Sequence, residues 1–460
     1  MVQIRFMKKE MLFFCFLILS IAATAQNDDS LFIRRIADEI LTNGTAYDNL
    51  KVLTKTVGGR LSGSPAMVKA ERWGLSAMRH AAADTAWMQE CLVPHWVRGG
   101  QDVATANAGH GVLKKLDVLA LGNSVGSMKA LTAPVIEVEN FDALIRKRDA
   151  VKGKIVFYNY KFNPKFIHTF ESYADAVIYR GAGPSRAAEQ GAVAVIVRSM
   201  SHSTDNNPHT GATRYNDSFP KIPAVAVGLQ DADWLDSALQ KNNVTITLKT
   251  NGKFLPDTTG HNIIGEVKGT QFPDQYITIA GHLDSWDPAE GAHDDGAGCV
   301  QTIEVLRTLK ALGYQPKHSL RFVLFANEEN GGRGSAKYAE EAKRKGEKHI
   351  FALESDAGGF TPRGFSMTVP DAAFKKINTW KPLLEPYGAA GFVQGGGGAD
   401  TEPLQQTQGT PVAELQPDSQ RYFDIHHSRA DKLEAVNKRE LELGAVAIAA
   451  FIYLVDKYGL

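Results

Sequence analysis

The sequence has little cysteine and no excess of either charge. Its 460 residues include three cysteines and 51 basic and 51 acidic residues, which give a formal net charge of +0. So few thiols exclude a disulfide scaffold, and we expect Cys91 and Cys299 to be buried and free rather than bridged. The balanced charge gives no electrostatic reason to expect binding to nucleic acid or to an anionic membrane surface. With 43% hydrophobic residues, the composition is that of a globular protein with two or three domains.

Long apolar runs are also absent, except near the N-terminus. A basic segment at 5–9 precedes an apolar stretch at 11–22, and the small-x-small motif ATA follows at 23–25. This order predicts a cleaved signal peptide at 1–25, because a membrane-spanning helix needs about 20 apolar residues. The alternative is an uncleaved membrane anchor. We therefore expect an exported protein, periplasmic or secreted, with no membrane contact after cleavage.

The pattern of elements predicts one domain inserted into another. The flanking segments, 26–128 and 253–460, have the character of one larger domain, whose later part alternates strands and helices. That alternation favours an α/β fold with a mostly parallel, mixed sheet flanked by helices. The segment 129–252 forms an α/β unit of its own, with predicted strands at 131–138, 152–160, 191–199 and 222–228.

Metal-ligand residue types follow four predicted strands of the larger domain. The segments are GHLDSWDPAEGAHDDGAG at 281–298, FANEENGGRGS at 325–335, ALESDAGG at 352–359 and FDIHHSRAD at 423–431. A single His or Asp after a strand is more often a turn or cap residue, and adjacent glutamates are usually a solvated surface. Ligands bind at the carboxyl ends of strands in open α/β sheets, so four such segments at one edge predict a metal site.

The residue types indicate which metal this site would hold. Imidazole and carboxylate without a thiolate suit zinc, for which cobalt or manganese can substitute. One catalytic zinc has three protein ligands, so five ligands are too many for a single ion. Five ligands suit two zinc ions that share one carboxylate and lie about 3.5–4 Å from each other. We therefore expect two Zn²⁺ per chain. A neighbouring glutamate could take the proton of an activated water, so that no nucleophilic side chain is required.

The same segments resemble the motifs of the co-catalytic zinc exopeptidases, the family of the Aeromonas and Streptomyces type of bacterial aminopeptidase. TVGGRLSGS at 56–64 and PHW at 94–96 extend the resemblance toward the carboxypeptidase Q (plasma glutamate carboxypeptidase) branch. The resemblance implies the phosphorylase/hydrolase-like fold of zinc exopeptidases. It also implies that 129–252 is a protease-associated domain that restricts access to the site or contributes to homodimer contacts.

The resemblance further implies hydrolysis of dipeptides or short peptides that have free termini. Two alternatives remain open. One is an aminopeptidase with the same metal centre, because the groups that recognise peptide ends lie in variable loops. The other is a binding protein of the same fold that has lost catalysis.

Carried over residue by residue, the resemblance implies a ligand set and two supporting roles. The two zinc ions would share five ligands, which are His282, Asp294 and Asp356 for one ion and Asp294, Glu329 and His427 for the other. Asp294 would therefore bridge the two ions. Glu328 would be the general base. Asp284 would accept a hydrogen bond from His282 and so fix the orientation of that imidazole.

Neighbouring residues leave alternatives within the motifs. In GAHDDGAG the bridging position of the family matches Asp294 rather than Asp295, and His293 stands where the family has no ligand. His427 begins the pattern His-[Ser/Thr]-x-x-Asp, which leaves His426 as the alternative ligand.

Two further polar segments lie outside these motifs. The segment SHSTDNNPHTG at 201–211 is typical of a solvated loop, so we expect no metal role for His202 or His209. The glycine-rich segment at 394–400 lacks the Lys-Ser/Thr ending of a phosphate-binding loop, which argues against nucleotide binding. It is either a gate that faces the substrate or a plain connector.

Overall fold

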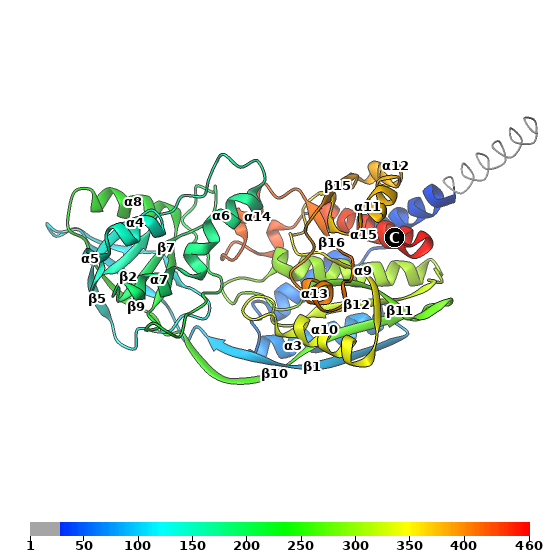
Figure 1. Ribbon diagram of the computed structural model, residues 1–460, viewed down its shortest axis with the longest axis horizontal. Coiled ribbons are helices and arrows are strands. Elements are labelled where there is room, and N and C mark those ends of the chain that lie inside the picture. The colour runs from blue at the N-terminus through cyan, green and yellow to red at the C-terminus, as the bar shows by residue number, and fades with distance from the viewer. Residues whose placement is uncertain (1–27) are drawn as a thin grey trace, which may run out of the picture.

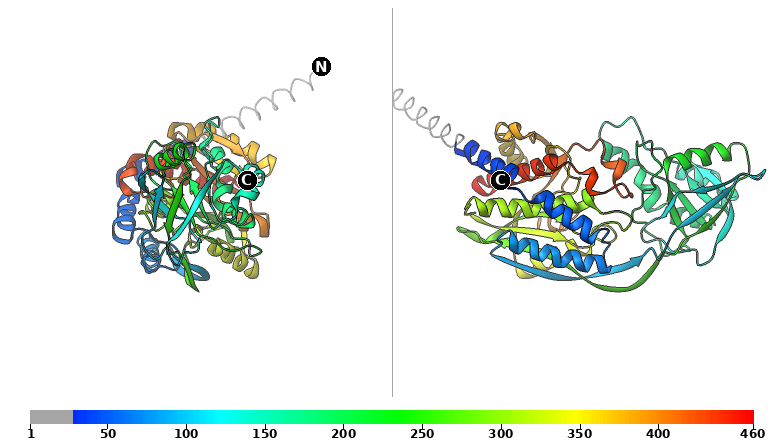
Figure 2. Two further views of the ribbon diagram at one scale, coloured as in Figure 1. Left: turned by 90° about the vertical axis from the view of Figure 1, so that its left-hand side faces the viewer. Right: turned by 180° about the vertical axis from the view of Figure 1, so that it is seen from behind.

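A computed structural model describes residues 28–460, which form two parts that lie side by side along the long axis of the molecule (Figures 1 and 2). The predicted signal peptide at 1–25 lies outside the described residues. Each part is built on a sheet of eight strands. Among the described residues, no helix is both long enough and apolar enough to cross a membrane.

The first sheet is mixed. Its strands, in spatial order, are β1 (Thr85–Val97), β10 (Lys253–Val267), β12 (His318–Phe325), β11 (Phe272–His282), β13 (Lys348–Glu354), β16 (Val412–Pro417), β14 (Pro362–Thr368) and β15 (Gly391–Gln394). β12, β11, β13 and β16 form a parallel centre. The pairs β1–β10, β10–β12 and β14–β16 are antiparallel. The carboxyl ends of the four central strands therefore meet at one edge.

Helices cover both faces of this sheet. Residues 28–43 are helical. The other elements are α2 (Ala46–Val52), η1 (Leu53–Val57), α3 (Pro65–His80), η2 (Ala292–Gly296), α9 (Ala297–Ala311), α10 (Arg333–Lys345), α11 (Asp371–Asn378), α12 (Lys381–Leu384), η3 (Glu385–Tyr387), α13 (Glu402–Gln408), α14 (Tyr422–Ile425), η4 (Leu433–Ala435) and α15 (Lys438–Tyr458). Ile277 and Ile279 of β11 pack with α9 and α15 on one face, and Ala280 packs with α10 on the other. Burial on both faces explains why the central strands are continuously apolar.

The second sheet forms a part of its own. Its strands, in spatial order, are β3 (Leu113–Leu116), β2 (Val103–Asn107), β9 (Thr245–Lys249), β5 (Leu131–Val138), β6 (Ile155–Tyr158), β7 (Ala194–Arg198), β8 (Ala224–Val227) and β4 (Val118–Ala120). Its helices are α4 (Phe141–Arg146), α5 (Arg148–Val151), α6 (Thr169–Gly181), α7 (Gly183–Glu189) and α8 (Leu229–Leu239). Three strands, β2 to β4, precede residue 129, so this sheet extends outside the predicted insert.

The chain passes between the two parts through the antiparallel pair of β1 and β10. β1 leads into β2, and β9 leads back into β10, so that both crossings lie side by side (Figure 1). Residues 371–384 form two helices, α11 and α12, rather than one, and Pro382 lies in the first turn of α12.

Candidate metal centre

Three of the four predicted segments begin at the carboxyl ends of neighbouring parallel strands. β11 ends at His282 itself, β12 ends shortly before Glu328 and Glu329, and β13 ends two residues before Asp356. The fourth segment differs from the prediction, since His427 follows the short helix α14 rather than a strand. Its imidazole nevertheless reaches the same edge.

The five predicted ligands lie together around Asp294, whose two carboxylate oxygens face opposite partners. Asp294 Oδ1 is 3.2 Å from Nε2 of His282, and that nitrogen is 3.3 Å from Asp356 Oδ1. Asp294 Oδ2 is 3.1 Å from Nε2 of His427, which is also 3.1 Å from Glu329 Oε2. Asp294 therefore lies between the two imidazoles, and Glu329 also lies within 4.8 Å of His282 and Asp294.

Several atoms of this cluster are buried and have no hydrogen-bond partner. They are His282 Nε2, Asp294 Oδ2 and Glu329 Oε1. Buried polar atoms in proteins almost always have a hydrogen-bond partner. Three that have none, and that are of the types that bind metals, fit a site for a cation. Nitrogen and carboxylate oxygen without sulfur are the donors that zinc accepts.

The charges of the cluster agree with such a cation. Burial disfavours a charged Asp294, but the close imidazoles of His282 and His427 hold the pKa of its carboxyl well below its usual range. Burial raises the pKa of Glu329, and the neighbouring Asp294 raises it further. Burial also raises the pKa of Glu328, to which Asp356 adds. A divalent cation would relieve this crowding of buried carboxylates.

The backbone that carries Asp294 is held by Asp431 and Asp295. Asp431 Oδ1 accepts from the N–H groups of Ala292 (3.1 Å) and His293 (2.7 Å), and its Oδ2 accepts from Asp294 (3.2 Å). Asp295 also lies near His282 and Asp356. However, its two oxygens accept from the backbone N–H groups of His282 and Gly298. Asp295 therefore braces the loop, and Asp294 remains the acid that faces both imidazoles.

Arg60 braces the same loop from the segment at 56–64. Its buried guanidinium donates to the backbone carbonyls of Leu283, Glu290 and Gly291. In the sequence that segment shows only a resemblance to the family, whereas in the structure it has a physical role. An arginine that satisfies three carbonyls at once fixes the path of the loop between His282 and Asp294.

Asp284 holds a different group from the one predicted. His282 Nδ1 donates to the backbone carbonyl of Asp284 at 3.0 Å, whereas the carboxylate Oδ1 lies 3.8 Å away. The carboxylate instead accepts from the backbone N–H of Glu328 (3.0 Å) and from the hydroxyl of Ser62 (3.3 Å). The carbonyl of Asp284 is therefore the group that orients the ring of His282, and the side chain of Asp284 positions Glu328.

The two other histidines of the motifs differ in position. His293 Nδ1 accepts from the N–H of Gly359, and its ring stacks on Phe360 at 4.3 Å, so it faces away from the cluster. Burial lowers the pKa of His293 to about 4. His426 stacks on His427 at 3.6 Å, and its Nε2 is 3.5 Å from Asp294 Oδ2.

The second sheet's part reaches the cluster through the loop at 201–211, which contradicts the interpretation of that loop as solvated. The N–H of Thr210 donates to the carbonyl of His427 at 2.8 Å, and the carbonyl of Thr210 lies 3.3 Å from Nδ1 of His427. His209 is buried, and burial lowers its pKa to about 4. Short polar residues indicate a loop, but they do not indicate what the loop packs against.

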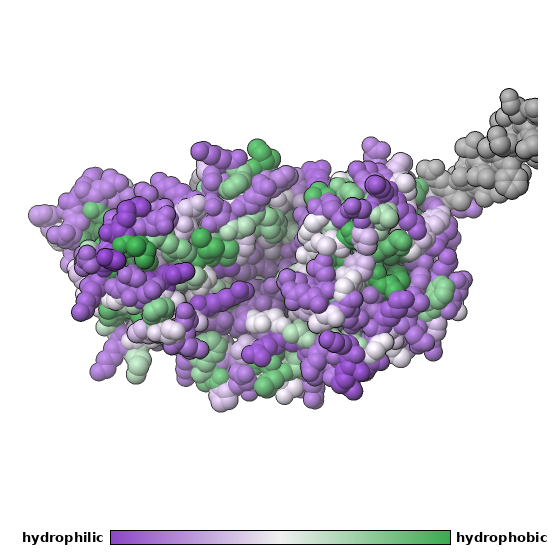
Figure 3. Space-filling view, viewed as in Figure 1, coloured by the Kyte–Doolittle hydropathy of each residue, from purple (hydrophilic) through white to green (hydrophobic). Residues whose placement is uncertain are grey.

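A pocket of about 520 Å³ opens on the cluster between the two parts. One wall carries Asp294, Glu328, Glu329, Asp356 and His427. The facing wall comes from α6 and the segment that follows the loop at 201–211, with residues Phe170, Tyr173, Val177, Ile178, Arg180 and Arg214. Figure 3 shows the surface hollowed between the two parts. No pattern in the sequence indicated the facing wall.

Asp400 is a further acid near the cluster that the sequence did not assign. The glycine-rich segment before it follows β15 and approaches β13 so closely that a Cβ on Gly398 would lie 2.0 Å from Glu354 Oε2. Burial raises the pKa of the Asp400 carboxyl to about 7. Its charge in turn raises the pKa of Glu328. The run of glycines is the feature of the sequence that could have indicated this close approach.

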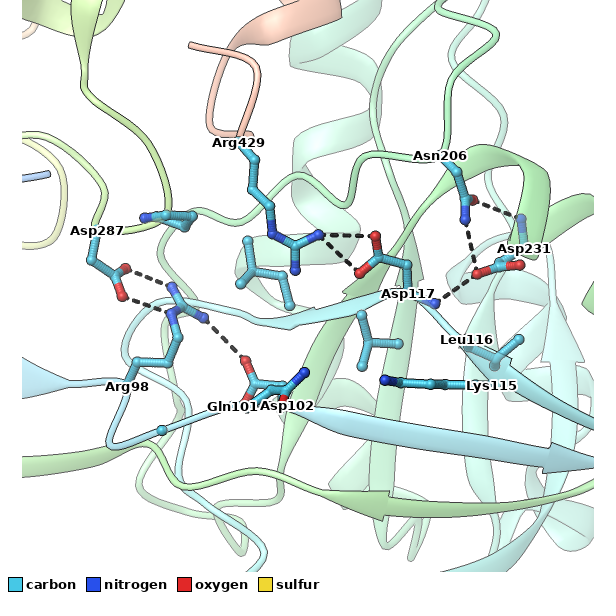
Figure 4. Close-up of a pocket in the computed structure, with 14 residues that line it drawn as sticks. Arg98, Gln101, Asp102, Lys115, Leu116, Asp117, Asn206, Asp231, Asp287 and Arg429 are labelled. Carbon is cyan, nitrogen blue, oxygen red and sulfur yellow. Dashed lines mark hydrogen bonds and ion pairs between the residues drawn. The ribbon is translucent and has the colours of Figure 1, made fainter. Parts of the chain in front are cut away.

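Two ion pairs join the loops of the cluster to the second sheet's part, one at residue 98 before β2 and one at residue 117 between β3 and β4 (Figure 4). Arg98 donates to both oxygens of Asp287 at 2.7 Å. Arg429, two residues beyond His427, lies 2.9 Å from both oxygens of Asp117. Both pairs line a second pocket of about 590 Å³.

Comparison with known proteins points to one family. The sequence pattern of peptidase family M28 matches residues 262–452. Carboxypeptidase Q of Mus musculus is 33% identical over 412 residues, which cover 89% of this chain and 85% of that protein. The crystal structure of a peptidase M28 precursor from Shewanella amazonensis is 30% identical, with a TM-score of 0.88 and coverage of 94% and 97%. A zinc aminopeptidase from Bacillus subtilis is 22% identical, with a TM-score of 0.64 and coverage of 89% and 94%. These structures confirm the predicted α/β fold.

Proposed function

Because the chain belongs to peptidase family M28 and is therefore a metallopeptidase, we propose that it is an exported dizinc exopeptidase that hydrolyses dipeptides or short peptides. The observation that supports two ions is the position of Asp294, whose oxygens face two separate imidazoles at 3.2 and 3.1 Å. A site for a single ion would not need a second histidine on the opposite side of the same carboxylate.

We assign His282, Asp294 and Asp356 to one zinc ion and Asp294, Glu329 and His427 to the other. His427 is preferred to His426 because its Nε2 is 3.1 Å from both Asp294 and Glu329, whereas that of His426 is 3.5 Å from Asp294 alone. Bound zinc would polarise the scissile carbonyl and make an attacking water more acidic. The backbone carbonyls of Asp284 and Thr210 orient the two imidazoles toward these positions.

Glu328 is assigned as the general base. It lines the pocket beside the ligands, and Asp284 holds its backbone N–H at 3.0 Å. Its carboxylate would take a proton from the attacking water and then donate that proton to the leaving amine. No serine or cysteine is required as a nucleophile. Cys91 and Cys299 are both buried free thiols, as predicted from the sequence.

The test is the variant Glu328→Gln, which keeps the shape of the side chain but cannot accept the proton. Turnover of a dipeptide should fall about 100- to 10,000-fold, while metal analysis still finds two zinc ions per chain. Glu340→Gln, on the exposed surface of α10, is the matched control and should change neither quantity. Unchanged turnover in Glu328→Gln would contradict the role of Glu328 as general base. A content of one zinc ion per chain would contradict the proposal of a dizinc centre.

An aminopeptidase with the same centre is the second candidate, supported by the fold shared with the zinc aminopeptidase of Bacillus subtilis. A panel of peptides with blocked ends separates the two. Hydrolysis of N-acetylated dipeptides excludes an aminopeptidase, because that class requires a free α-amino group. A protein that binds zinc and peptides but hydrolyses none of the panel would instead be a binding protein of this fold.

Export and a homodimer are part of the same proposal. Export is supported by the basic and apolar segments before residue 26. The N-terminal sequence of the mature protein recovered from outside the cytoplasm should begin at Gln26. A dimer should appear as a doubled mass in solution, and a monomer at micromolar concentration would contradict it.

A further inference from the structure

We propose that Trp286 is a positioning residue of the metal centre, whose indole N–H donates to the carboxylate of Glu329 and so favours the ion held by Glu329 and His427. This inference rests on the proposed function and goes beyond it, because it adds a side chain that is not a metal ligand. Trp286 stands in the loop between His282 and Asp294, four residues after the end of β11.

The indole N–H of Trp286 is a buried donor without an acceptor. The residue is 3% exposed, and nothing among residues 28–460 accepts a hydrogen bond from its Nε1. The neighbouring Trp96 shows the usual arrangement, since its Nε1 donates to the carbonyl of Ser124 at 2.9 Å. Buried donors in proteins almost always have a partner, because an unpaired one is costly. The N–H of Trp286 therefore requires an acceptor nearby.

Trp286 lies directly against the residues assigned to one of the two ions. It lines a cavity of about 10 Å³ together with Asp294, Glu329 and His427. A cavity of this size holds about one water molecule. A donor on one wall can therefore reach an acceptor on the other directly or through a single water. The ring of Trp286 also contacts that of His427, with 5.8 Å between the centroids and 63° between the planes.

The acceptor follows from the oxygen-bearing side chains that line this cavity. Asp431 already accepts from three backbone N–H groups, and Ser428 both donates to a carbonyl and accepts from an N–H. Asp294 Oδ2 faces an imidazole nitrogen at 3.1 Å. Glu329 Oε2 faces the same nitrogen, but Glu329 Oε1 is buried and unpaired. Glu329 Oε1 is therefore the side-chain oxygen that remains for the N–H of Trp286.

The indole is fixed from its far edge by the second sheet's part. A Cβ on Gly122, which follows β4, would lie 1.8 Å from Cη2 of Trp286, so the six-membered ring packs directly against backbone. A ring fixed between the two parts gives its N–H a fixed direction. A hydrogen bond to the second oxygen of a ligating carboxylate orients that ligand and strengthens metal binding.

The first experiment is a zinc titration of Trp286→Phe, which keeps an aromatic ring but removes the N–H. The affinity for one of the two ions should fall about 10- to 100-fold, while the affinity for the other stays within about threefold of the wild type. Trp96→Phe is the matched control, because Trp96 packs in the same apolar cluster, and it should leave both affinities unchanged. Unchanged affinities in Trp286→Phe, or equal losses in both variants, would overturn the proposal.

The second experiment identifies the acceptor from the indole N–H signals of protein labelled with nitrogen-15 tryptophan. The chain has six tryptophans, and the signal that is absent from Trp286→Phe belongs to Trp286. This signal should move downfield when zinc is added to the wild type. The shift should disappear in Glu329→Gln and persist in Asp356→Asn, which removes a ligand of the other ion. The opposite pattern would overturn the proposal. A wild type that holds only one zinc ion would instead refute the dizinc centre itself, and this inference with it.

Discussion

The two walls of the pocket differ in how they are built and in their charge. The wall at the edge of the first sheet is rich in carboxylates, and the side chains of Asp431 and Asp284 accept hydrogen bonds from the backbone N–H groups of Asp294 and Glu328. The facing wall, from α6 and the segment after the loop at 201–211, is apolar and contains two arginines. The first wall carries the candidate metal ligands, whereas the second places two arginines opposite them. The two walls meet at His427, which contacts Thr210 and Arg180 of the second sheet's part.

Removing the residue that both halves of the first wall share should have the largest effect. In Asp294→Asn, one carboxylate oxygen becomes an amide nitrogen, which cannot bind a cation. Zinc content should fall below two per chain, and metal affinity should fall well beyond the 10- to 100-fold that is typical of a residue that only orients a ligand. Metal analysis and turnover together check this. Asp295→Asn should weaken the loop without this selective loss, and two retained zinc ions in Asp294→Asn would contradict the bridge.

A smaller effect is expected when the support behind the first wall is changed. Asp284→Asn leaves the backbone carbonyl that accepts from His282, but it weakens the acceptor for the N–H of Glu328. We expect kcat to fall about 10- to 100-fold with two zinc ions retained. Asp274→Asn, on the exposed start of β11, is the control. Loss of zinc from Asp284→Asn would show that the carboxylate orients His282 after all.

The difference between the walls also explains what the sequence could predict. Residues such as His282, Glu329 and Asp356 stand directly after apolar strands, so strand order alone places them at one edge. The facing wall depends on pairings across the chain. Arg180 and Thr210 meet His427 over separations of 247 and 217 residues, and no local pattern records such contacts. The role of Asp284 was missed for a finer reason, since residue type does not show whether the side chain or the carbonyl meets a ring.

The smallest effect concerns the ion pairs that join the two walls. Arg98 is 11% exposed and donates twice to Asp287, which is 33% exposed, whereas Arg429 and Asp117 are 41% and 40% exposed. A double-mutant cycle with Arg98→Gln and Asp287→Asn should give a coupling free energy of about 1 kcal/mol in unfolding. The same cycle with Arg429→Gln and Asp117→Asn should give less, because solvent screens the more exposed pair.

Neither cycle should alter zinc content, because no ligand is touched, and kcat should remain within about threefold of the wild type. The KM for the dipeptide should rise more than kcat changes in the Arg98–Asp287 cycle, since that pair helps to hold the wall that carries Arg180 opposite the metal centre. Raising the salt concentration should shrink both couplings, the exposed one first. A fall in zinc content in either cycle would mean that the two walls are not independent, and that the second one helps to form the centre.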